Sequence, residues 1–438
     1  MSGRNPRSRM LKVLLFFIVF ISQVFVGATE QLDWVSERFD EKNTSYYPEH
    51  SSKIDTILWT QYAGDIVVAR PIAVNGIVYV TSMDGKVYAI STELGSKIWE
   101  TQVALPFTWA AINPVGGIIA SPVYSKGKLY VLIRDGAIFS LDAYTGKILW
   151  KYELENETAI TPTLVDDRYL IFFDDTGRIY IFDVEKREIV KTYHFREYIW
   201  AKAAYDGKRY VYIGTYRGRI IKLDKTTWNI TKMVFNLTMI RGGVVGALVY
   251  SEGRIYFTTS ESFVYALDEN LNLVWSVKLR GPALGGPAVS ETFVFVASAD
   301  TYVYCIDKDT GDIIWSTALN HESSSTIAVS KNYVYLVDDY GYIYCIDKKT
   351  GTIIWNRAEF AGARFEYWKI SAGLNLIKGL SGPIIYGKNI YVGLLDKRIV
   401  SIGEGGGISI SPLMLYSSIV MALALIFIAG MQRGKKRK

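Results

Sequence analysis

The side chains that most often carry out chemistry in proteins are sparse in this sequence and lie far apart. Its 438 residues include three histidines, His50, His194 and His321, and two cysteines, Cys305 and Cys345. Three isolated histidines argue against a histidine-based metal centre or a nucleophile–base pair. Two cysteines exclude a disulfide scaffold, a zinc ribbon and an iron–sulfur site.

Acidic residues gather at several places, but their spacing does not fit a metal site. The run from Asp307 to Asp312 resembles the start of a calcium loop, yet its glycine comes one position early and its twelfth position is Ala318. Three acidic pairs fall at predicted turns or strand ends: Asp166-Asp167, Asp174-Asp175 and Asp338-Asp339. Phosphate-binding loops, nucleophile elbows and zinc-protease motifs are missing from the sequence. We expect no catalytic residues and no metal ligands.

A sequence repeat must position whatever site the chain has. It is sharpest from Asp300 to Trp315 and from Tyr340 to Trp355, two stretches that match at a distance of 40 residues. The repeat occurs eight times. Its third predicted strand ends in turn at Ser91, Asp142, Asp183, Asp224, Asp268, Asp307, Asp347 and Gly403. Repeats of about this length are typical of propellers and other stacked-unit folds.

Each repeat predicts four antiparallel strands. A glycine turn such as Gly85 supplies the positive φ of a tight hairpin, and the third strand alternates apolar and small residues before its closing Asp. We expect that Asp to cap the Thr-Gly turn ahead and the fourth strand to end with a Trp that packs between sheets. Trp59 has no preceding three strands, and the repeat ending at Gly403 lacks a Trp strand. The N-terminal strand should therefore complete the last of eight blades.

The Tyr-Cys-Ile-Asp-x-x-Thr-Gly-x-x-x-Trp frame resembles the repeat of the pyrroloquinoline-quinone-like β-propellers. The resemblance covers about residues 54–403 and predicts an all-β, eight-bladed propeller. That superfamily includes quinoprotein alcohol dehydrogenases and an outer-membrane assembly scaffold, so it does not decide between enzyme and binding module.

The dehydrogenases of this superfamily imply specific groups around their quinone. They use a vicinal cysteine pair, a Trp, a calcium or lanthanide ion and an Asp base. This chain has no Cys-Cys, and Cys305 and Cys345 occupy one repeat position that mostly holds small residues. We therefore expect no cofactor, with pyrroloquinoline quinone and calcium as the alternative.

The connections between blades carry the strongest binding signal. Aromatic and basic residues concentrate where a fourth strand crosses to the next first strand, and such connections converge on one face of a propeller. Aromatic side chains beside Arg suit recognition of a sugar, an acidic group or a partner loop. The candidate binding residues are Trp109, Arg196, Tyr198, Trp200, Arg241, Arg364, Tyr367, Trp368 and Lys369. The alternative is that these tryptophans cap the core beneath longer loops.

The two ends of the chain predict export and membrane anchoring. Residues 1–28 resemble a signal peptide or an N-terminal anchor, and residues 29–53 lead into the propeller. After a linker at 404–412, residues 413–432 predict a transmembrane helix, and the basic tail 433–438 is typical of the cytoplasmic side. The propeller should therefore lie outside the cell membrane in a single-pass topology. Four sequons fit that placement: Asn43, Asn156, Asn229 and Asn236.

The charge distribution narrows the class of partner. The formal net charge is +6, but nine of the 49 basic residues lie beside the two terminal apolar segments. The remaining 40 basic residues face 43 acidic ones, which argues against nucleic-acid binding. We expect a non-catalytic binding or scaffold module for an envelope protein, a peptide or a glycan. The alternatives are a divergent quinone-dependent dehydrogenase and a surface receptor for solutes or polysaccharides.

Overall fold

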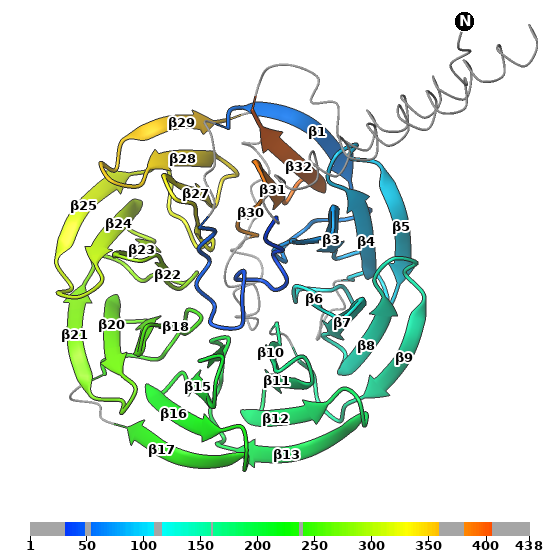
Figure 1. Ribbon diagram of the computed structural model, residues 1–438, viewed down its shortest axis with the longest axis horizontal. Coiled ribbons are helices and arrows are strands. Elements are labelled where there is room, and N and C mark those ends of the chain that lie inside the picture. The colour runs from blue at the N-terminus through cyan, green and yellow to red at the C-terminus, as the bar shows by residue number, and fades with distance from the viewer. Residues whose placement is uncertain are drawn as a thin grey trace, which may run out of the picture.

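Each repeat folds into one four-stranded antiparallel sheet, and eight such sheets stand around a common axis (Figure 1). The computed structural model describes residues 31–48, 54–108, 116–158, 161–235, 240–358 and 381–404. These residues contain strands and no helix, which confirms the predicted all-β, eight-bladed propeller. The predicted signal segment, transmembrane helix and basic tail lie outside them. Within the described ranges no helix is long and apolar enough to cross a membrane.

The blades are numbered here in chain order, and each sheet contains four consecutive strands except the last. Blades 1 to 4 contain β2 (Ile72–Val74), β3 (Ile77–Thr81), β4 (Lys86–Ser91), β5 (Lys97–Gln102); β6 (Val123–Ser125), β7 (Lys128–Ile133), β8 (Ala137–Asp142), β9 (Ile148–Glu153); β10 (Thr163–Val165), β11 (Tyr169–Phe173), β12 (Arg178–Asp183), β13 (Glu188–His194); β14 (Ala204–Tyr205), β15 (Tyr210–Gly214), β16 (Arg219–Asp224) and β17 (Asn229–Phe235). Blades 5 to 8 contain β18 (Val249–Ser251), β19 (Arg254–Thr258), β20 (Phe263–Asp268), β21 (Leu273–Lys278); β22 (Ala288–Val289), β23 (Phe293–Ala297), β24 (Tyr302–Asp307), β25 (Ile313–Ala318); β26 (Ala328–Val329), β27 (Tyr333–Val337), β28 (Ile343–Asp347), β29 (Ile353–Arg357); β30 (Ile384–Tyr386), β31 (Asn389–Gly393), β32 (Arg398–Gly403) and β1 (Thr56–Tyr62).

The N-terminal strand closes the ring as predicted. In blade 8, β1 pairs antiparallel with β32, and Thr56 lies opposite Gly403. The sheet order is β1-β32-β31-β30, so a strand from the start of the chain completes a sheet from its end. Closure leaves no unpaired blade edge between the first and last repeats.

The predicted turn chemistry is present between the third and fourth strands. Asp142 Oδ1 accepts hydrogen bonds from the backbone nitrogens of Tyr144 (3.1 Å) and Thr145 (2.8 Å). Gly146 follows at φ 71°, and a Cβ there would lie 2.6 Å from the Trp99 ring of the preceding blade. Glycine is therefore required both by the backbone conformation and by the packed indole.

The repeated tryptophans join neighbouring blades. Trp99 Nε1 donates to the Ala143 carbonyl oxygen at 3.0 Å, and Trp315 Nε1 donates to the Lys348 carbonyl oxygen at 3.1 Å. One detail of the prediction is wrong, because the fourth strand does not end at its Trp. Strand β5 continues to Gln102, which pairs with Lys86 and extends the sheet by three residues beyond Trp99.

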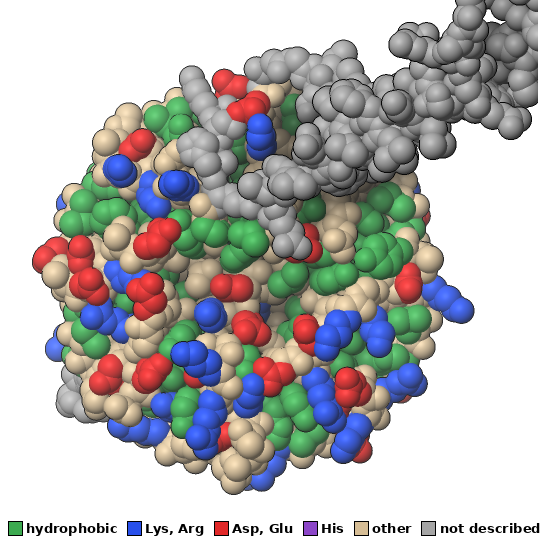
Figure 2. Space-filling model, viewed as in Figure 1, with side chains coloured by type: hydrophobic (Ala, Val, Ile, Leu, Met, Phe, Trp, Pro, Cys, Tyr) green, Lys and Arg blue, Asp and Glu red, His purple; other side chains and the backbone are tan. Residues whose placement is uncertain are grey.

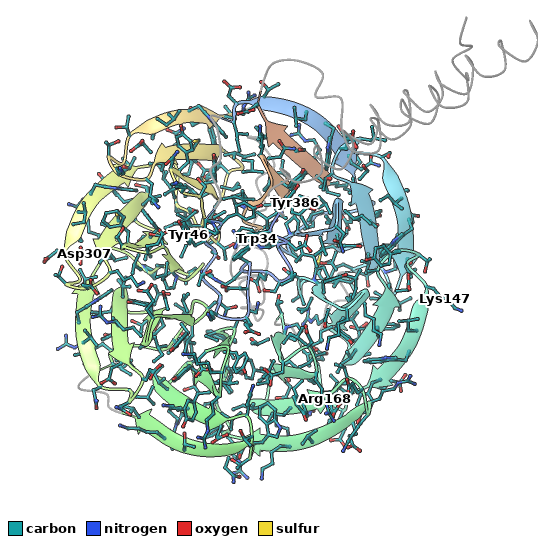
Figure 3. The ribbon with its side chains drawn as sticks, viewed as in Figure 1. Trp34, Tyr46, Lys147, Arg168, Asp307 and Tyr386 are labelled. Atoms are coloured by element: carbon teal, nitrogen blue, oxygen red, sulfur yellow. The ribbon has the colours of Figure 1, made fainter. Side chains whose placement is uncertain are left out.

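The lead-in segment, residues 31–48, fills the centre of the ring, a feature that the sequence did not indicate. Its backbone hydrogen bonds to the innermost strands of six blades in ring order, reaching Ala73, Tyr124, Tyr205, Tyr250, Val289 and Val329. Figure 1 shows this segment in dark blue inside the ring, and Figure 3 places Trp34 and Tyr46 near its centre. Trp34 and Tyr47 are fully buried, so the lead-in segment belongs to the core.

Candidate binding face

The loops of the propeller divide between two faces. The loops joining first to second and third to fourth strands form what we call the turn face. The loops joining second to third strands, together with the blade-to-blade connections, form the connection face. Hydrogen bonds tie the second group together: Phe107 N donates to the Met83 carbonyl oxygen (2.7 Å), and Tyr216 N donates to the Tyr198 carbonyl oxygen (2.8 Å).

The two ends of the lead-in segment contact turns of the turn face. Asn75 N, in the first turn of blade 1, donates to Asp33 Oδ1 at 3.0 Å. Gly387 N, in the corresponding turn of blade 8, donates to the Tyr47 hydroxyl at 3.2 Å. The described candidates Arg196, Tyr198, Trp200 and Arg241 lie in the connections, so they belong to the opposite face from these turns.

An aromatic cluster of Tyr198, Trp200 and Tyr216 forms the centre of the candidate site. The Tyr198 and Trp200 rings stack with centroids 5.5 Å apart and an interplanar angle of 25°. The Trp200 and Tyr216 centroids are 4.1 Å apart. Tyr198 is 53% exposed and Tyr216 is 37% exposed, whereas Trp200 is half-buried between them. Two flat rings are thus presented to solvent on a packed indole, an arrangement that suits contact with a partner.

Buried polar contacts hold this cluster in place. Glu197, which is 6% exposed, forms an ion pair with Arg219 and accepts a 3.0 Å hydrogen bond from Thr215 Oγ1. A Cβ on Gly243 would lie 1.9 Å from the Tyr216 carbonyl oxygen, so the next connection presses directly against the cluster. The exposed rings are therefore supported by close backbone packing.

Cations and aromatic rings continue from the cluster across the next three blades. Arg241 lies over the Phe263 ring at 5.9 Å, and Arg280 lies over the Tyr302 ring at 5.4 Å. In each case the Arg comes from a blade-to-blade connection, and the ring belongs to the first residue of the third strand in the blade that follows. In blade 7 the His321 ring stacks on Tyr340 with centroids 3.9 Å apart, while His321 Nδ1 lies 3.1 Å from Asp338 Oδ2.

The structure thus brings together part of the predicted site. Arg196 is exposed at φ 54° beside Tyr198 and Trp200, and Arg241 lies in the next connection. The remaining candidates lie outside the described residues: Trp109, Arg364, Tyr367, Trp368 and Lys369. Sequence reasoning missed the aromatic members Tyr216, Phe263, Tyr302 and Tyr340. A signal was present for two of them, because Phe263 and Tyr302 share one repeat position, five residues before the closing Asp.

The described sequons differ in accessibility. Asn229 is exposed at the start of β17, and Asn156 is half-buried with its amide donating to the Tyr180 hydroxyl at 3.2 Å. Asn43 corrects its own prediction as a glycosylation site. It is fully buried, and its Nδ2 donates to Ala203 and Leu248 carbonyl oxygens, which leaves no space for a glycan on this nitrogen in the folded ring. Asn236 lies outside the described residues.

Several groups that the resemblance implies around a quinone with calcium can be compared with the described residues. Cys305 and Cys345 are free and fully buried in the third strands of blades 6 and 7, and burial raises the pKa of the Cys305 thiol to about 12. A Cβ on Gly246 would lie 2.3 Å from Gly286 Cα, so the backbones of two connections meet with no space for a planar cofactor between them. Across the described ranges, no group of three or more His, Cys, Asp or Glu residues is arranged to hold a metal.

Charges of both signs are interspersed over the propeller face seen in Figure 2. Ion pairs connect many of them, such as Lys225 with Asp166 and Arg254 with Asp309. These four residues lie at turns of the turn face, where the mixed charge does not resemble the basic patches through which proteins bind nucleic acids.

Comparison with known proteins identifies relatives with the same repeat. A family model described as outer membrane protein assembly factor BamB matches residues 107–196, 194–285 and 272–407. The outer membrane protein assembly factor BamB of Kangiella koreensis is 26% identical over 200 residues, covering 46% of this chain and 50% of that protein. The chain thus spans about half the length of this curated relative.

Solved structures share the fold at low sequence identity. BamB from Moraxella catarrhalis superimposes with a TM-score of 0.62 and 16% identity, covering 81% of this chain and 98% of that chain. The quinohemoprotein alcohol dehydrogenase of Comamonas testosteroni gives a TM-score of 0.64 and 13% identity, covering 86% and 81%. An assembly factor and an enzyme both match this chain. These similarities therefore establish the propeller fold, and they do not indicate which activity the chain has.

Proposed function

This chain belongs to the PQQ-like repeat family described as outer membrane protein assembly factor BamB, and from that membership we propose that it is a non-catalytic binding or scaffold module for another envelope protein. The observation that carries the proposal is the exposed aromatic cluster of Tyr198, Trp200 and Tyr216 on the connection face. A partner peptide or a glycan would use the same surface.

The chemistry of the surface indicates what the partner should offer. Rigid Tyr and Trp rings bury large apolar area at little cost in side-chain entropy, and Arg adds directed hydrogen bonds. The exposed guanidinium groups of Arg196, Arg217 and Arg241 lie in the same loops or in the next connection. A segment that combines acidic with apolar side chains would complement both features.

The placement of the chain ends supports a membrane-anchored arrangement. A Cβ on Gly387 would lie 2.7 Å from Gln31 Nε2, and a Cβ on Gly403 would lie 2.4 Å from Asn389 Oδ1. Both ends of the described chain therefore leave beside the same turn of blade 8, on the turn face. If residues 413–432 anchor the protein with its propeller outside, as we propose, the turn face is directed to the membrane and the connection face to the partner.

The proposal is tested by comparing two pairs of substitutions in the full chain. Tyr198→Ala with Arg217→Ala removes exposed groups from the connection face. Tyr144→Ala with Lys147→Ala removes a matched exposed pair from the turn face. Crosslinking on intact cells should give a discrete partner adduct that the first pair abolishes and the second pair retains. Equal adducts from both variants would contradict the proposed face.

A titration with pyrroloquinoline quinone and calcium, followed by a dye-linked alcohol oxidation assay, separates the scaffold from the quinone-dependent dehydrogenase. The scaffold proposal predicts neither heat of binding nor turnover. Tight binding with turnover would replace it with the enzyme.

A further inference from the structure

One repeat position lines the axis of the ring, two residues before each innermost strand. All eight members are buried. Six of them are small, among them Ser121, Thr161 and Thr326, whereas blades 1 and 4 carry Arg70 and Lys202. Two long cationic side chains thus stand in a ring of small residues, at exposures of only 2% and 4%.

A third cation enters the axis from the lead-in segment, and the two guanidinium groups bind only neutral oxygens. Arg38 is fully buried and donates to the carbonyl oxygens of Asn43 (3.3 Å), Gly285 (2.5 Å) and Pro287. Arg70 donates to carbonyl oxygens, including that of Pro383 at 2.9 Å, and to the Ser45 hydroxyl at 3.1 Å. Neither forms an ion pair with any carboxylate in the described part of the chain.

The Lys202 ammonium has no hydrogen-bond or ion-pair partner among the described residues. Glu37 and Asp40 are close enough to affect it electrostatically, but Asp40 already accepts hydrogen bonds from Thr44 N and Thr44 Oγ1, both at 3.0 Å. Burial lowers the pKa of Lys202 to about 8 and that of Arg38 to about 10, and these carboxylates do not offset that cost. Buried cationic side chains with so little compensating negative charge are rare, because removing an ion from water is unfavourable.

Buried polar atoms that lack a partner lie at the same level of the ring. Thr326 Oγ1, from the axial position of blade 7, and Ser381 Oγ, one residue before that of blade 8, are both buried without one among the described residues. Hydroxyl groups can donate to an anion, and an ammonium group supplies both charge and hydrogen bonds.

We propose that a small oxyanion of the phosphate or carboxylate class binds on the ring axis, held directly by the Lys202 ammonium within the positive field of Arg38 and Arg70. The anion supplies the counter-charge that the described side chains lack. Because it lies between blades 1, 4 and 7 and the lead-in segment, it also ties this segment to the ring. The site lies at the inner ends of the connections, on the ring axis, and its binding test does not require the partner proposed for Tyr198, Trp200 and Tyr216.

The test uses the purified full chain in detergent, with inorganic phosphate and acetate as probes and chloride at equal ionic strength as the reference. A ligand that binds only the folded protein raises its melting temperature. We expect an increase of roughly 3 °C or more at 10 mM phosphate or acetate. The Lys202→Met variant should lose the increase, and Lys147→Met, which removes a surface lysine, should keep it.

Direct binding keeps the proposal falsifiable if Lys202→Met does not fold. Calorimetric titration of the unsubstituted chain should give saturable binding at one site per chain, and Lys202→Arg, which keeps the charge, should retain it. If only one of the two probes binds, that result identifies the source of the oxyanion. Absence of saturable binding by both probes, or an equal increase in melting temperature with Lys202→Met, would overturn the proposal.

Discussion

The side-chain nitrogen of Asn43 donates a 2.7 Å hydrogen bond to the carbonyl oxygen of Ala203, 160 residues further along the chain. The same nitrogen donates to the Leu248 carbonyl oxygen at 2.9 Å, so one amide joins the lead-in segment to blades 4 and 5. Asn43 adopts φ 64°, a conformation that Asn and Asp tolerate better than most residues. The lead-in segment is thus part of the folded core.

Asn43→Asp should therefore destabilise the fold strongly. A carboxylate keeps the backbone conformation but has no hydrogen to donate, and it would face two carbonyl oxygens in a buried site. We expect a loss of about 3 kcal/mol in the free energy of unfolding, measured by urea denaturation. Asn229→Asp is the matched control at an exposed sequon and should change stability by less than about 0.5 kcal/mol. Equal effects of the two variants would contradict the buried role of Asn43.

A second pair of variants compares two of the tryptophans that join neighbouring blades. Trp99 Nε1 donates to Ala143, whereas the buried Trp355 Nε1 has no partner among the described residues. Phe keeps most of the ring packing and removes only the N–H. Trp99→Phe should cost about 1 kcal/mol more than Trp355→Phe, because only the first variant loses a hydrogen bond. A larger loss at Trp355 would show that packing alone determines these contacts.

Glu41 predicts a pH dependence of stability. Burial, with Asp40 and Asp166 adding negative charge, raises the pKa of Glu41 from 4.5 to about 7. Between these values the folded protein holds a proton that the unfolded chain has lost. The free energy of unfolding therefore falls as pH rises through this window.

Glu41→Gln should remove this dependence. At pH 8 the variant should be more stable than the unsubstituted chain by about 1 to 2 kcal/mol, allowing for partial exposure of the carboxyl, and the two should agree near pH 4. Denaturation curves from pH 4 to 8 measure the difference. Glu93→Gln, in an exposed turn, controls for the loss of one negative charge. A pH-independent difference at Glu41 would exclude it as the titrating group.

The parts of the fold that could be predicted are those specified within one repeat. Asp142, Thr145 and Gly146 interact within five residues, so their spacing is visible in the sequence and recurs in other blades. Ring closure was also predictable, because Trp59 stands one repeat length before Trp99 without its own blade.

The path of the lead-in segment could not be predicted in the same way. Arg38 bonds to Gly285, 247 residues away, and no periodicity connects the two. The binding face was predicted only in part for a related reason. The ring order brings Arg280 from one repeat over Tyr302 in the next, and this contact depends on how consecutive blades are rotated. Burial of Asn43 was hidden similarly, since a sequon carries no information about exposure.

Site-specific photocrosslinking on intact cells tests directly whether the connection face binds a partner. A photoreactive phenylalanine analogue replaces Tyr198 on the connection face or, as a control, Tyr144 on the turn face. These two tyrosines are 53% and 52% exposed, so they differ in face and hardly in accessibility. The account predicts a discrete crosslinked product of higher mass from position 198 and none from position 144. The same product from both positions, or a product from 144 alone, would contradict a partner-binding connection face.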